Sequence, residues 1–234
     1  MKAKLEAKAI IPFKKGGAKS RLEDFLSEKE RGEFAIRMLK DVLIALSESK
    51  IEEAEIISTC SEEGLREEME LKPELDSELN SKSRLKLTVR EDERGLNEVL
   101  NEVIKEEKSP LLIIMADIPL ATPESINEII EHKEDVVIAP GRKGGTNALF
   151  LHRPDEFAVS YYGVSCSEHV ETAKRMGLSH VIHDSFFISV DIDEVDDLME
   201  LLIHGRGFSA EYLRKIGVFM RVDKNSKMRA KVDR

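Results

Sequence analysis

Residues 110–120 read PLLIIMADIPL, the most apolar stretch of the chain. Such a run predicts a buried strand near the centre of a sheet, and Pro119 ends it. Asp117 follows the strand directly. A carboxylate held at the end of a buried strand needs a partner, and a divalent cation such as Mg²⁺ is a suitable one. The alternative role is a helix N-cap, although the next helix is predicted to begin only at Thr122.

On either side of this stretch, short β-branched runs alternate with helical patterns. We expect strands at 7–12, 54–60, 85–90, 136–139 and 147–152, and an extended segment at 180–190. Helices are expected at 28–49, 95–107, 122–132, 165–177 and 194–205, and an acidic helix-and-loop connection at 61–80. The alternation predicts an α/β fold with a mostly parallel central sheet flanked by helices. In such folds ligands bind beyond the carboxyl ends of the strands.

The segment after the first strand, residues 12–22, reads PFKKGGAKSRL. Its two glycines allow the main chain to curl and to present N–H groups to an anion. Lys14, Lys15, Lys19 and Arg21 add four positive charges in a chain of net charge −10. This is the local basic patch that a bound polyphosphate would require. It lacks the GxxxxGK[ST] pattern of a P-loop, and a solvated turn with surface lysines is the alternative.

Two further polar loops follow predicted strands. Residues 139–149, APGRKGGTNAL, form a second basic, glycine-rich loop, with a flexible hairpin as the alternative. Residues 191–193, DID, follow the extended segment. We expect one of Asp191 and Asp193 to face inward and to supply a second metal ligand. N-capping of the next helix is the competing role for one of the two.

The composition limits the class of protein. Of the 234 residues, 41% are hydrophobic and 35% are charged, which is sufficient for one large α/β domain with a solvated surface. The net negative charge disfavours nucleic acid or an anionic membrane as a partner. The two cysteines indicate neither a disulfide framework nor a zinc site. No apolar run approaches the roughly 20 residues of a membrane span, so we expect a cytoplasmic protein.

Together the candidate residues favour phosphoryl transfer. Strand-end carboxylates and basic loops supply metal binding and charge stabilisation, which is most of what such centres need. The sequence contains no evident Ser/His or Cys/His nucleophile, and its six histidines lack HxH or HxxxH spacing. We interpret His169 and His183 as structural rather than metal-binding.

The sequence resembles the 2-phospho-L-lactate guanylyltransferases of deazaflavin coenzyme F-420 biosynthesis, a family of the Rossmann-like nucleotidyltransferase class. The resemblance runs from Ile11 to about Leu202 and rests on six motifs in order. They are IPFKKGGAKSRL (11–22), GLN (95–97), ADIPL (116–120), APGRKGGTNAL (139–149), YGVSCSEH (162–169) and DIDEVDDL (191–198). Cys166 departs from the family, much of which is expected to have an aromatic residue there in the wall of the acceptor pocket.

The resemblance implies roles for the matched positions. Lys14, Lys19 and Arg21 would hold the GTP triphosphate, and Lys19 and Arg21 would also serve catalysis together with Asp117. The remaining implied roles are nucleoside binding by Gly95 and Asn97, Mg²⁺ binding by Asp117 with Asp191 or Asp193, and acceptor binding by Thr146, Gly163 and Ser165. We expect Thr146 and Ser165 to hold the two ends of one small acid that carries a carboxylate and a phosphate, and the alternative for Ser165 is a plain helix cap.

The implied reaction transfers GMP from GTP to 2-phospho-L-lactate, or to a related phosphorylated acid such as phosphoenolpyruvate, and releases pyrophosphate. The resemblance further implies a homodimer. We expect a nucleotidyltransferase domain at 1–210 and a basic C-terminal extension at 211–234, packed at an interface. One alternative is a nucleotidyltransferase for another acceptor, such as a cobinamide, molybdopterin or sugar phosphate. The other is a non-catalytic nucleotide-binding regulatory protein, which would not need both Asp117 and the 191/193 pair.

Overall fold

The computed structural model describes residues 7–17, 19–69, 85–222 and 230–234. The elements of the first half are β1 (Lys8–Phe13), η1 (Ser20–Leu22), α1 (Glu28–Ser47), β2 (Glu53–Ser58), α2 (Glu62–Glu68), β3 (Lys86–Glu91), α4 (Leu96–Glu106) and β4 (Leu111–Ile114). Those of the second half are α5 (Pro123–Ile130), β5 (Val136–Pro140), β6 (Thr146–Leu151), η2 (Pro154–Glu156), α6 (Ser165–Arg175), β7 (His180–Ile182), α7 (Phe186–Ser189), α8 (Asp197–His204), α9 (Phe208–Lys215), β8 (Phe219–Val222) and β9 (Ala230–Asp233).

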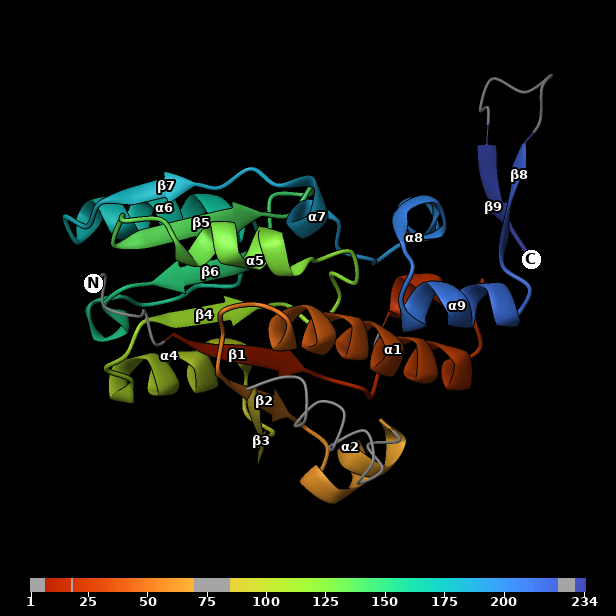
Figure 1. The fold of residues 1–234 in the computed structure, drawn as a ribbon, viewed down its shortest axis with the longest axis horizontal. Coiled ribbons are helices and arrows are strands. Elements are labelled where there is room, and N and C mark those ends of the chain that lie inside the picture. The colour runs from red at the N-terminus through yellow and green to blue at the C-terminus, as the bar shows by residue number, and fades with distance from the viewer. Residues whose placement is uncertain (1–6, 18, 70–84, 223–229) are drawn as a thin grey trace.

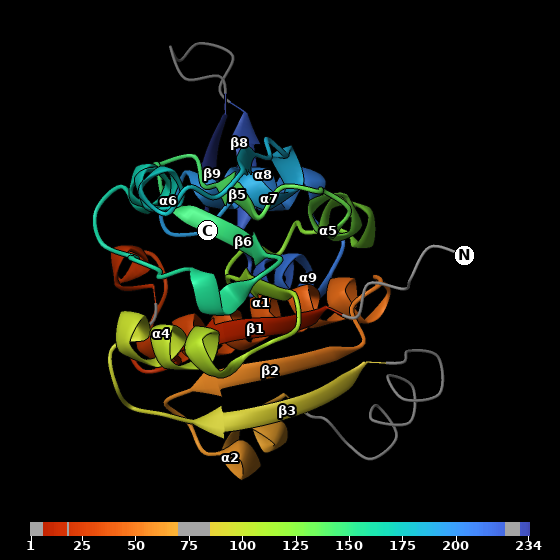
Figure 2. The same cartoon turned by 90° about the vertical axis from the view of Figure 1, so that its left-hand side faces the viewer.

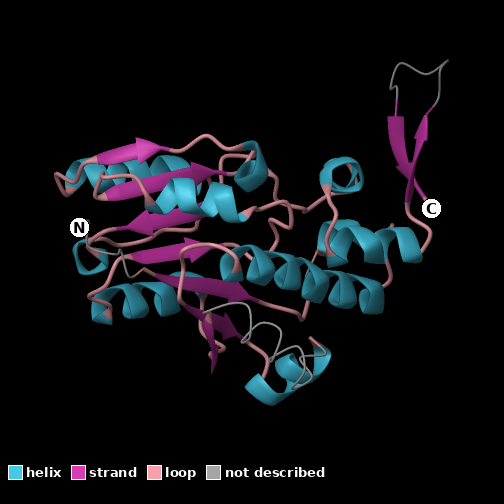
Figure 3. Ribbon diagram, in the orientation of Figure 1, coloured by secondary structure: helices cyan, strands magenta, loops and turns pink. Residues whose placement is uncertain are grey.

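A seven-stranded sheet in the order β3-β2-β1-β4-β6-β5-β7 forms the centre of the molecule (Figure 1). Its middle strand is β4, as residues 110–116 predicted. Strand β6 runs antiparallel to both β4 and β5, and the other neighbouring pairs of this sheet are parallel. The predicted α/β fold with a mostly parallel sheet is therefore confirmed, and strands and helices alternate along most of the chain (Figure 3).

Helices cover both faces of the sheet. Along β4, Leu112 and Ile114 belong to the core that includes α1 and α5, whereas Leu111 and Ile113 belong to the core that includes α4 and α6. The strand reads as an unbroken apolar run because both of its faces are buried. Figure 2 shows α5 and α6 on opposite sides of the sheet.

Side-chain caps fix the beginnings of two core helices. The Ser27 hydroxyl accepts a hydrogen bond from the Glu30 N–H, and the Glu30 carboxylate accepts one from the Ser27 N–H, which forms the capping box of α1. Thr122 caps α5 in the same way with Ser125, and Pro123 occupies the first turn. The start of α5 at this Thr-Pro pair agrees with the sequence prediction.

The prediction of an extended segment at 180–190 is wrong at residues 186–189. Strand β7 is short, and residues Phe186–Ser189 form the helical turn α7. The Asn147 side-chain amide donates to the Ile188 carbonyl (2.9 Å), and the Arg142 N–H donates to the Ser189 carbonyl (3.1 Å). These contacts with the 141–147 loop fasten a turn that the local apolar pattern does not indicate.

The last part of the chain packs through α9 and ends in a hairpin whose last residues contact the main body, with Val232 against the core and Arg234 paired with Glu30. The Asp41 carboxylate on α1 accepts hydrogen bonds from the Phe208 N–H (2.7 Å) and the Ser209 N–H (3.0 Å), which caps α9 from a distant helix. Residue 210, the predicted end of the domain, lies inside this helix. The β8–β9 hairpin stands away from the central sheet (Figure 1). Residues 223–229 of the predicted extension, and 70–80 of the predicted connection, lie outside the described residues. In the described part of the chain, no helix has the length and apolarity that a membrane span needs.

Candidate active site

Three segments that are far apart in the sequence meet beyond the carboxyl ends of β1 and β4. The Lys19 ammonium lies 2.6 Å from a carboxylate oxygen of Asp117 and 2.8 Å from one of Asp193. The Lys19 side chain is 8% exposed, and the two aspartates remain about one third exposed, at 32% and 35%. A buried cation thus bridges two carboxylates that still face solvent.

The loop after β1 holds Lys19 in an unusual backbone conformation. Lys19 has φ 56°, in the left-handed region, which costs a residue other than glycine roughly 1 kcal/mol. Arg21 forms an ion pair with Glu194 (3.1 Å) on the same side of the site. Lys14 is exposed, and Lys15 pairs with Glu68 of α2. Of the predicted triphosphate ligands, the structure therefore brings Lys19 and Arg21 into contact with the acidic residues 117 and 193–194.

The positive charge of Lys19 and the two carboxylates stabilise each other. Burial disfavours the ammonium of Lys19, but the charges and hydrogen bonds of Asp117 and Asp193 outweigh this and raise its pKa. Burial likewise opposes ionisation of Asp193, yet the positive charge of Lys19, with that of Lys143 and Arg21, lowers its pKa. Lysine and aspartate are accordingly both charged at neutral pH.

Asp191 and Asp193 have different surroundings. Asp193 reaches Lys19, whereas Asp191 accepts a hydrogen bond from the Asn147 side-chain amide (3.2 Å). Burial is the largest cause and raises the pKa of Asp191. The Asn147 hydrogen bond lowers this pKa in part, and the negative charges of Asp117 and Asp193 raise it further. Between them, the Ile192 N–H donates to the Asp117 carbonyl (3.0 Å) and fixes the two acidic loops together.

The described residues contain no group of three or more His, Cys, Asp or Glu side chains that could by itself hold a metal ion. Mg²⁺ does not require one, because it is commonly bound by one or two carboxylates while water and substrate phosphates complete its shell. An oxygen atom of Asp117 and one of Asp193 both lie within hydrogen-bonding distance of one nitrogen. This pair of oxygen donors therefore fits Mg²⁺ held jointly with a phosphate.

The second glycine-rich loop connects β5 to β6 as a tight hairpin, and its basic side chains face α8. Lys143 pairs with Asp197 (3.1 Å) and Arg142 with Glu200 (3.2 Å). Gly144, at φ 84°, turns the chain so that its carbonyl accepts a hydrogen bond from the Cys166 N–H of α6 (3.2 Å). The loop is therefore a junction between α6 and α8.

Replacing Gly141 by alanine is expected to destabilise the protein by about 2 kcal/mol, the usual scale of overpacking. An added Cβ would lie 2.6 Å from the Asn147 side-chain oxygen and 3.0 Å from an Asp191 oxygen, so the Asn147–Asp191 contact must move. Urea unfolding measures the loss. Gly145→Ala is the matched control, since a Cβ there meets nothing within 4 Å and the residue has no positive φ. Equal stability of the two variants would contradict this packing argument.

The predicted acceptor-binding residues come together at the start of α6. Thr146 opens β6 and Ser165 is the first residue of α6, with 3% and 4% of their surfaces exposed. Their hydroxyl oxygens are 3.3 Å apart, so the structure places the two hydroxyls at one point and not at two separate ends of a pocket. The N-cap of α6 is Val164, so the alternative of Ser165 as a helix cap is wrong. Gly163, at φ 56°, turns the chain into the helix.

Gly95 and Asn97 occupy the start of α4. Gly95 is the N-cap residue, and the Asn97 side-chain oxygen accepts a hydrogen bond from the Tyr161 N–H (2.7 Å). Asn101, one turn later, bonds Val159 through both its oxygen and its nitrogen. In this structure Asn97 therefore anchors the loop that precedes α6.

Two buried polar residues at the site were not predicted to lie there from the sequence, since Asn147 was given no role and His169 was interpreted only as structural. Asn147 joins α7 to Asp191, and His169 lies 2.9 Å from the Thr146 hydroxyl. The spacing of Ser165 and His169 was the available signal for the second, because residues four apart share one face of a helix.

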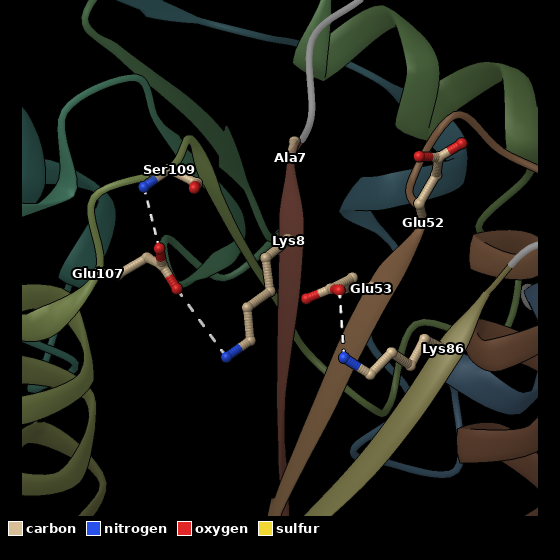
Figure 4. Close-up of a pocket in the computed structure, with 7 residues that line it drawn as sticks. All are labelled: Ala7, Lys8, Glu52, Glu53, Lys86, Glu107 and Ser109. Carbon is tan, nitrogen blue, oxygen red and sulfur yellow. Dashed lines mark hydrogen bonds and ion pairs between the residues drawn. The ribbon is translucent and has the colours of Figure 1, made fainter.

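Two hollows lie away from these residues. One of 640 Å³ is at the opposite edge of the sheet, lined among others by Lys8, Glu53 and Lys86 (Figure 4). Lys8 there pairs with Glu55 and Lys86 with Glu53 (3.3 Å), so its cations are already matched by carboxylates. A mostly apolar one of 300 Å³ lies between α1, α5 and the α8–α9 turn. Neither of these two hollows contains the charged cluster that the strand ends assemble.

The fold and the strand-end cluster define the class of protein. A nucleotidyl transferase from Methanothermobacter thermautotroptrophicus has a similar structure, with a TM-score of 0.54 and 10% identity over 90% of this chain and 99% of that one. A proposed nucleotide-diphospho-sugar transferase from Desulfovibrio desulfuricans G20 gives a TM-score of 0.64 and 17% identity over 89% and 94% of the two chains. The fold is that of the nucleotidyltransferases.

The sequence then gives the family. A family model described as "Guanylyl transferase CofC like" matches residues 7–234. A 2-phospho-L-lactate guanylyltransferase from Methanosarcina mazei is 45% identical over 206 residues, which are 88% of this chain and 91% of that protein. The chain belongs to the CofC-like guanylyltransferase family, and the resemblance found in the sequence is confirmed.

Proposed function

We propose that this protein transfers GMP from GTP to 2-phospho-L-lactate, or to a close analogue such as phosphoenolpyruvate, and releases pyrophosphate. The observation that carries the proposal is the meeting of Lys19, Asp117 and Asp193 at the carboxyl edge of the sheet. Relatives named 2-phospho-L-lactate guanylyltransferase, such as the one from Methanosarcina mazei, support the choice of nucleotide and acceptor.

The reaction needs no nucleophile from the enzyme. A phosphate oxygen of the acceptor attacks the α-phosphorus of GTP in line, the new P–O bond forms, and the bond from that phosphorus to the pyrophosphate oxygen breaks. The chain supplies position and charge. Lys19 and Arg21 neutralise the triphosphate, and the charge-assisted contacts strengthen as negative charge moves onto pyrophosphate.

Asp117 and Asp193 would hold Mg²⁺, and both lie close enough to Asp191 for their charges to raise its pKa. Bound there, the ion would act as a Lewis acid on the phosphates. Thr146, Ser165 and the positive end of the α6 dipole would bind an anionic group of the acceptor, since the N-terminus of an 11-residue helix favours negative charge. Gly163 allows the backbone to approach that group.

A pyrophosphate-release assay over a panel of nucleotides and acceptors tests the function. GTP with 2-phospho-L-lactate or phosphoenolpyruvate is expected to give the highest kcat/KM, and the activity is expected to require Mg²⁺. A preference for a cobinamide, molybdopterin or sugar phosphate would identify a different acceptor class. GTP binding without turnover on any acceptor would instead indicate a regulatory nucleotide-binding protein. The homodimer stays a prediction, which light scattering on the purified protein checks.

Replacing Arg21 by alanine is expected to weaken GTP binding about fivefold. A side chain this exposed contributes roughly 1 kcal/mol through a charge-assisted contact, and its ion pair with Glu194 releases it at little cost. Calorimetric titration of GTP in the presence of Mg²⁺ measures the change. Lys29→Ala, which removes one positive charge from the exposed surface of α1, is the control. Unchanged GTP affinity of the Arg21→Ala variant would show that Arg21 is a solvated surface residue that does not bind the nucleotide.

A further inference from the structure

His169 is a buried histidine whose two ring nitrogens both have partners. The residue is fully buried on α6, facing β6 and the 157–161 loop. Its Nε2 lies 3.1 Å from the Ser160 N–H, and its Nδ1 lies 2.9 Å from the Thr146 hydroxyl oxygen. The ring is further held edge-on by Tyr161, with the ring centroids 5.0 Å apart.

The backbone decides where the histidine carries its proton. A main-chain N–H can only donate, so Nε2 must present its lone pair to Ser160. Burial lowers the pKa of His169 to about 4, so the ring is neutral at physiological pH. A neutral imidazole with a bare Nε2 carries its hydrogen on Nδ1. The Nδ1–H of His169 therefore donates to the Thr146 hydroxyl, and the Thr146 hydroxyl does not donate to His169.

This direction determines what Thr146 can do. Its hydroxyl has one proton and two lone pairs, and Nδ1–H of His169 uses one lone pair. The Ser165 hydroxyl, 3.3 Å away, donates to the other. The Thr146 proton then points to neither neighbour. A hydroxyl with both lone pairs occupied can only donate a further hydrogen bond, and an anion is a suitable acceptor for it. Hydrogen bonds in series also polarise and strengthen one another.

The same histidine ties together three segments of the predicted acceptor pocket. Thr146 belongs to β6, Ser165 to α6, and Ser160 to a loop that Asn97 anchors to α4 through the Tyr161 N–H. A small error in the position of any segment would misalign the Thr146 hydroxyl. His169 is placed to prevent this, and because it is fully buried it would act on a ligand through the Thr146 hydroxyl.

We propose that His169 is a positioning residue of the acceptor pocket, which fixes the Thr146 hydroxyl as a donor to the carboxylate or phosphate of a small phosphorylated acid. This rests on the proposed function, because the acceptor is the ligand that the Thr146 hydroxyl would meet. The role predicts that the donor at Nδ1 matters for acceptor binding, whereas the acceptor at Nε2 matters mainly for holding the loop.

Two conservative variants separate these contributions. His169→Asn places an amide nitrogen near the position of Nδ1 and retains a donor to Thr146. His169→Gln can place its oxygen near the position of Nε2 and retain the acceptor for Ser160. We expect His169→Gln to raise the acceptor KM about tenfold or more, the scale of losing a hydrogen bond to a charged ligand, with the KM for GTP unchanged. His169→Asn should stay within about threefold of the wild type. The effects of Thr146→Val and His169→Gln should not multiply in the double variant, because they act through one hydroxyl.

Three results would overturn the inference. The first is an equal rise of the acceptor KM in both variants. The second is a parallel rise of the KM for GTP. The third is a nitrogen NMR spectrum in which the neutral His169 ring carries its proton on Nε2. If the wild type binds 2-phospho-L-lactate in calorimetry but releases no pyrophosphate, the proposed function is wrong, and the calorimetric Kd of the two variants still tests the positioning role of His169. If the wild type binds none of the acids, the proposed function and the role of His169 are both wrong.

Discussion

Asp117→Asn is expected to lower kcat by about 100-fold or more and to leave the melting temperature nearly unchanged. The substitution keeps the shape of the side chain but removes the negative charge at the end of β4. Loss of one charge-stabilising contact at a phosphoryl-transfer centre typically has this size. Folding should tolerate the change, because Lys19 retains its ion pair with Asp193 and the side chain of Asp117 is one third exposed.

The metal dependence makes this prediction specific. If Asp117 helps to hold Mg²⁺, the asparagine variant should need a higher Mg²⁺ concentration for half-maximal activity, since an amide oxygen is a weaker ligand for a hard cation. Pyrophosphate release at increasing Mg²⁺ measures both effects. Asp24→Asn, which removes one charge from an exposed position next to η1, is the control. Near-normal turnover of Asp117→Asn at saturating Mg²⁺ would remove Asp117 from the reaction.

The parts of this site that could be predicted from the sequence are those at which one local rule decides. The run PLLIIMA is apolar at every position because both faces of β4 are covered, and this placed the strand at the centre of the sheet. The carboxyl edge of a parallel sheet then pointed to the residues that follow the strands. Asp117 and Lys19 were found in this way from two different loops.

Contacts between distant elements could not be predicted in the same way. Nothing near residue 19 indicates that its side chain lies between Asp117 and Asp193, because the three positions are brought together only by the order of the strands. Thr146 and Ser165 were proposed to hold opposite ends of a ligand, yet the hairpin after β5 brings their hydroxyls together.

The prediction of an extended segment at 180–190 failed in part for a related reason. Its apolar and β-branched residues fit a strand, but two hydrogen bonds from the 141–147 loop hold Ile188 and Ser189 in a helical turn. Tertiary contacts of this kind override local preference. The turn matters for the site because Asn147, which makes one of these bonds, also bonds Asp191.

Lys19→Met is expected to affect both activity and stability. Methionine keeps the apolar stem of the lysine but removes the only ammonium shown in contact with both Asp117 and Asp193 in the described part of the chain. Turnover should fall by about 100-fold or more, because the variant loses the cation that we propose to neutralise the triphosphate. Stability at neutral pH should fall by about 2 kcal/mol. Breaking a fully buried pair costs about 3–5 kcal/mol, and we expect less here because the two carboxylates are one third exposed.

The pH dependence of this loss has a definite sign. The pKa of Asp193 is lowered in the folded wild type, with burial opposing the shift and Lys19 the largest cause that favours it. A lowered carboxyl pKa stabilises the fold at pH values above the ordinary aspartate pKa of about 3.9. This stabilisation is lost as the pH falls through the pKa of the folded state. The pKa of Lys19 is raised in the fold, so its contribution is present below the ordinary lysine pKa of about 10.4 and is lost as the pH rises through the folded pKa. The difference in melting temperature between wild type and Lys19→Met should therefore be full between about pH 5 and pH 9 and should shrink below about pH 4.

Lys19→Arg should recover part of the stability because it restores the charge. Millimolar Mg²⁺ should raise the melting temperature of Lys19→Met more than that of the wild type, because two adjacent carboxylates without a lysine bind a cation more readily. A variant with wild-type stability at pH 7 and no response to Mg²⁺ would show that the two carboxylates do not depend on Lys19, and the arrangement of charges on which the proposed function rests would be wrong.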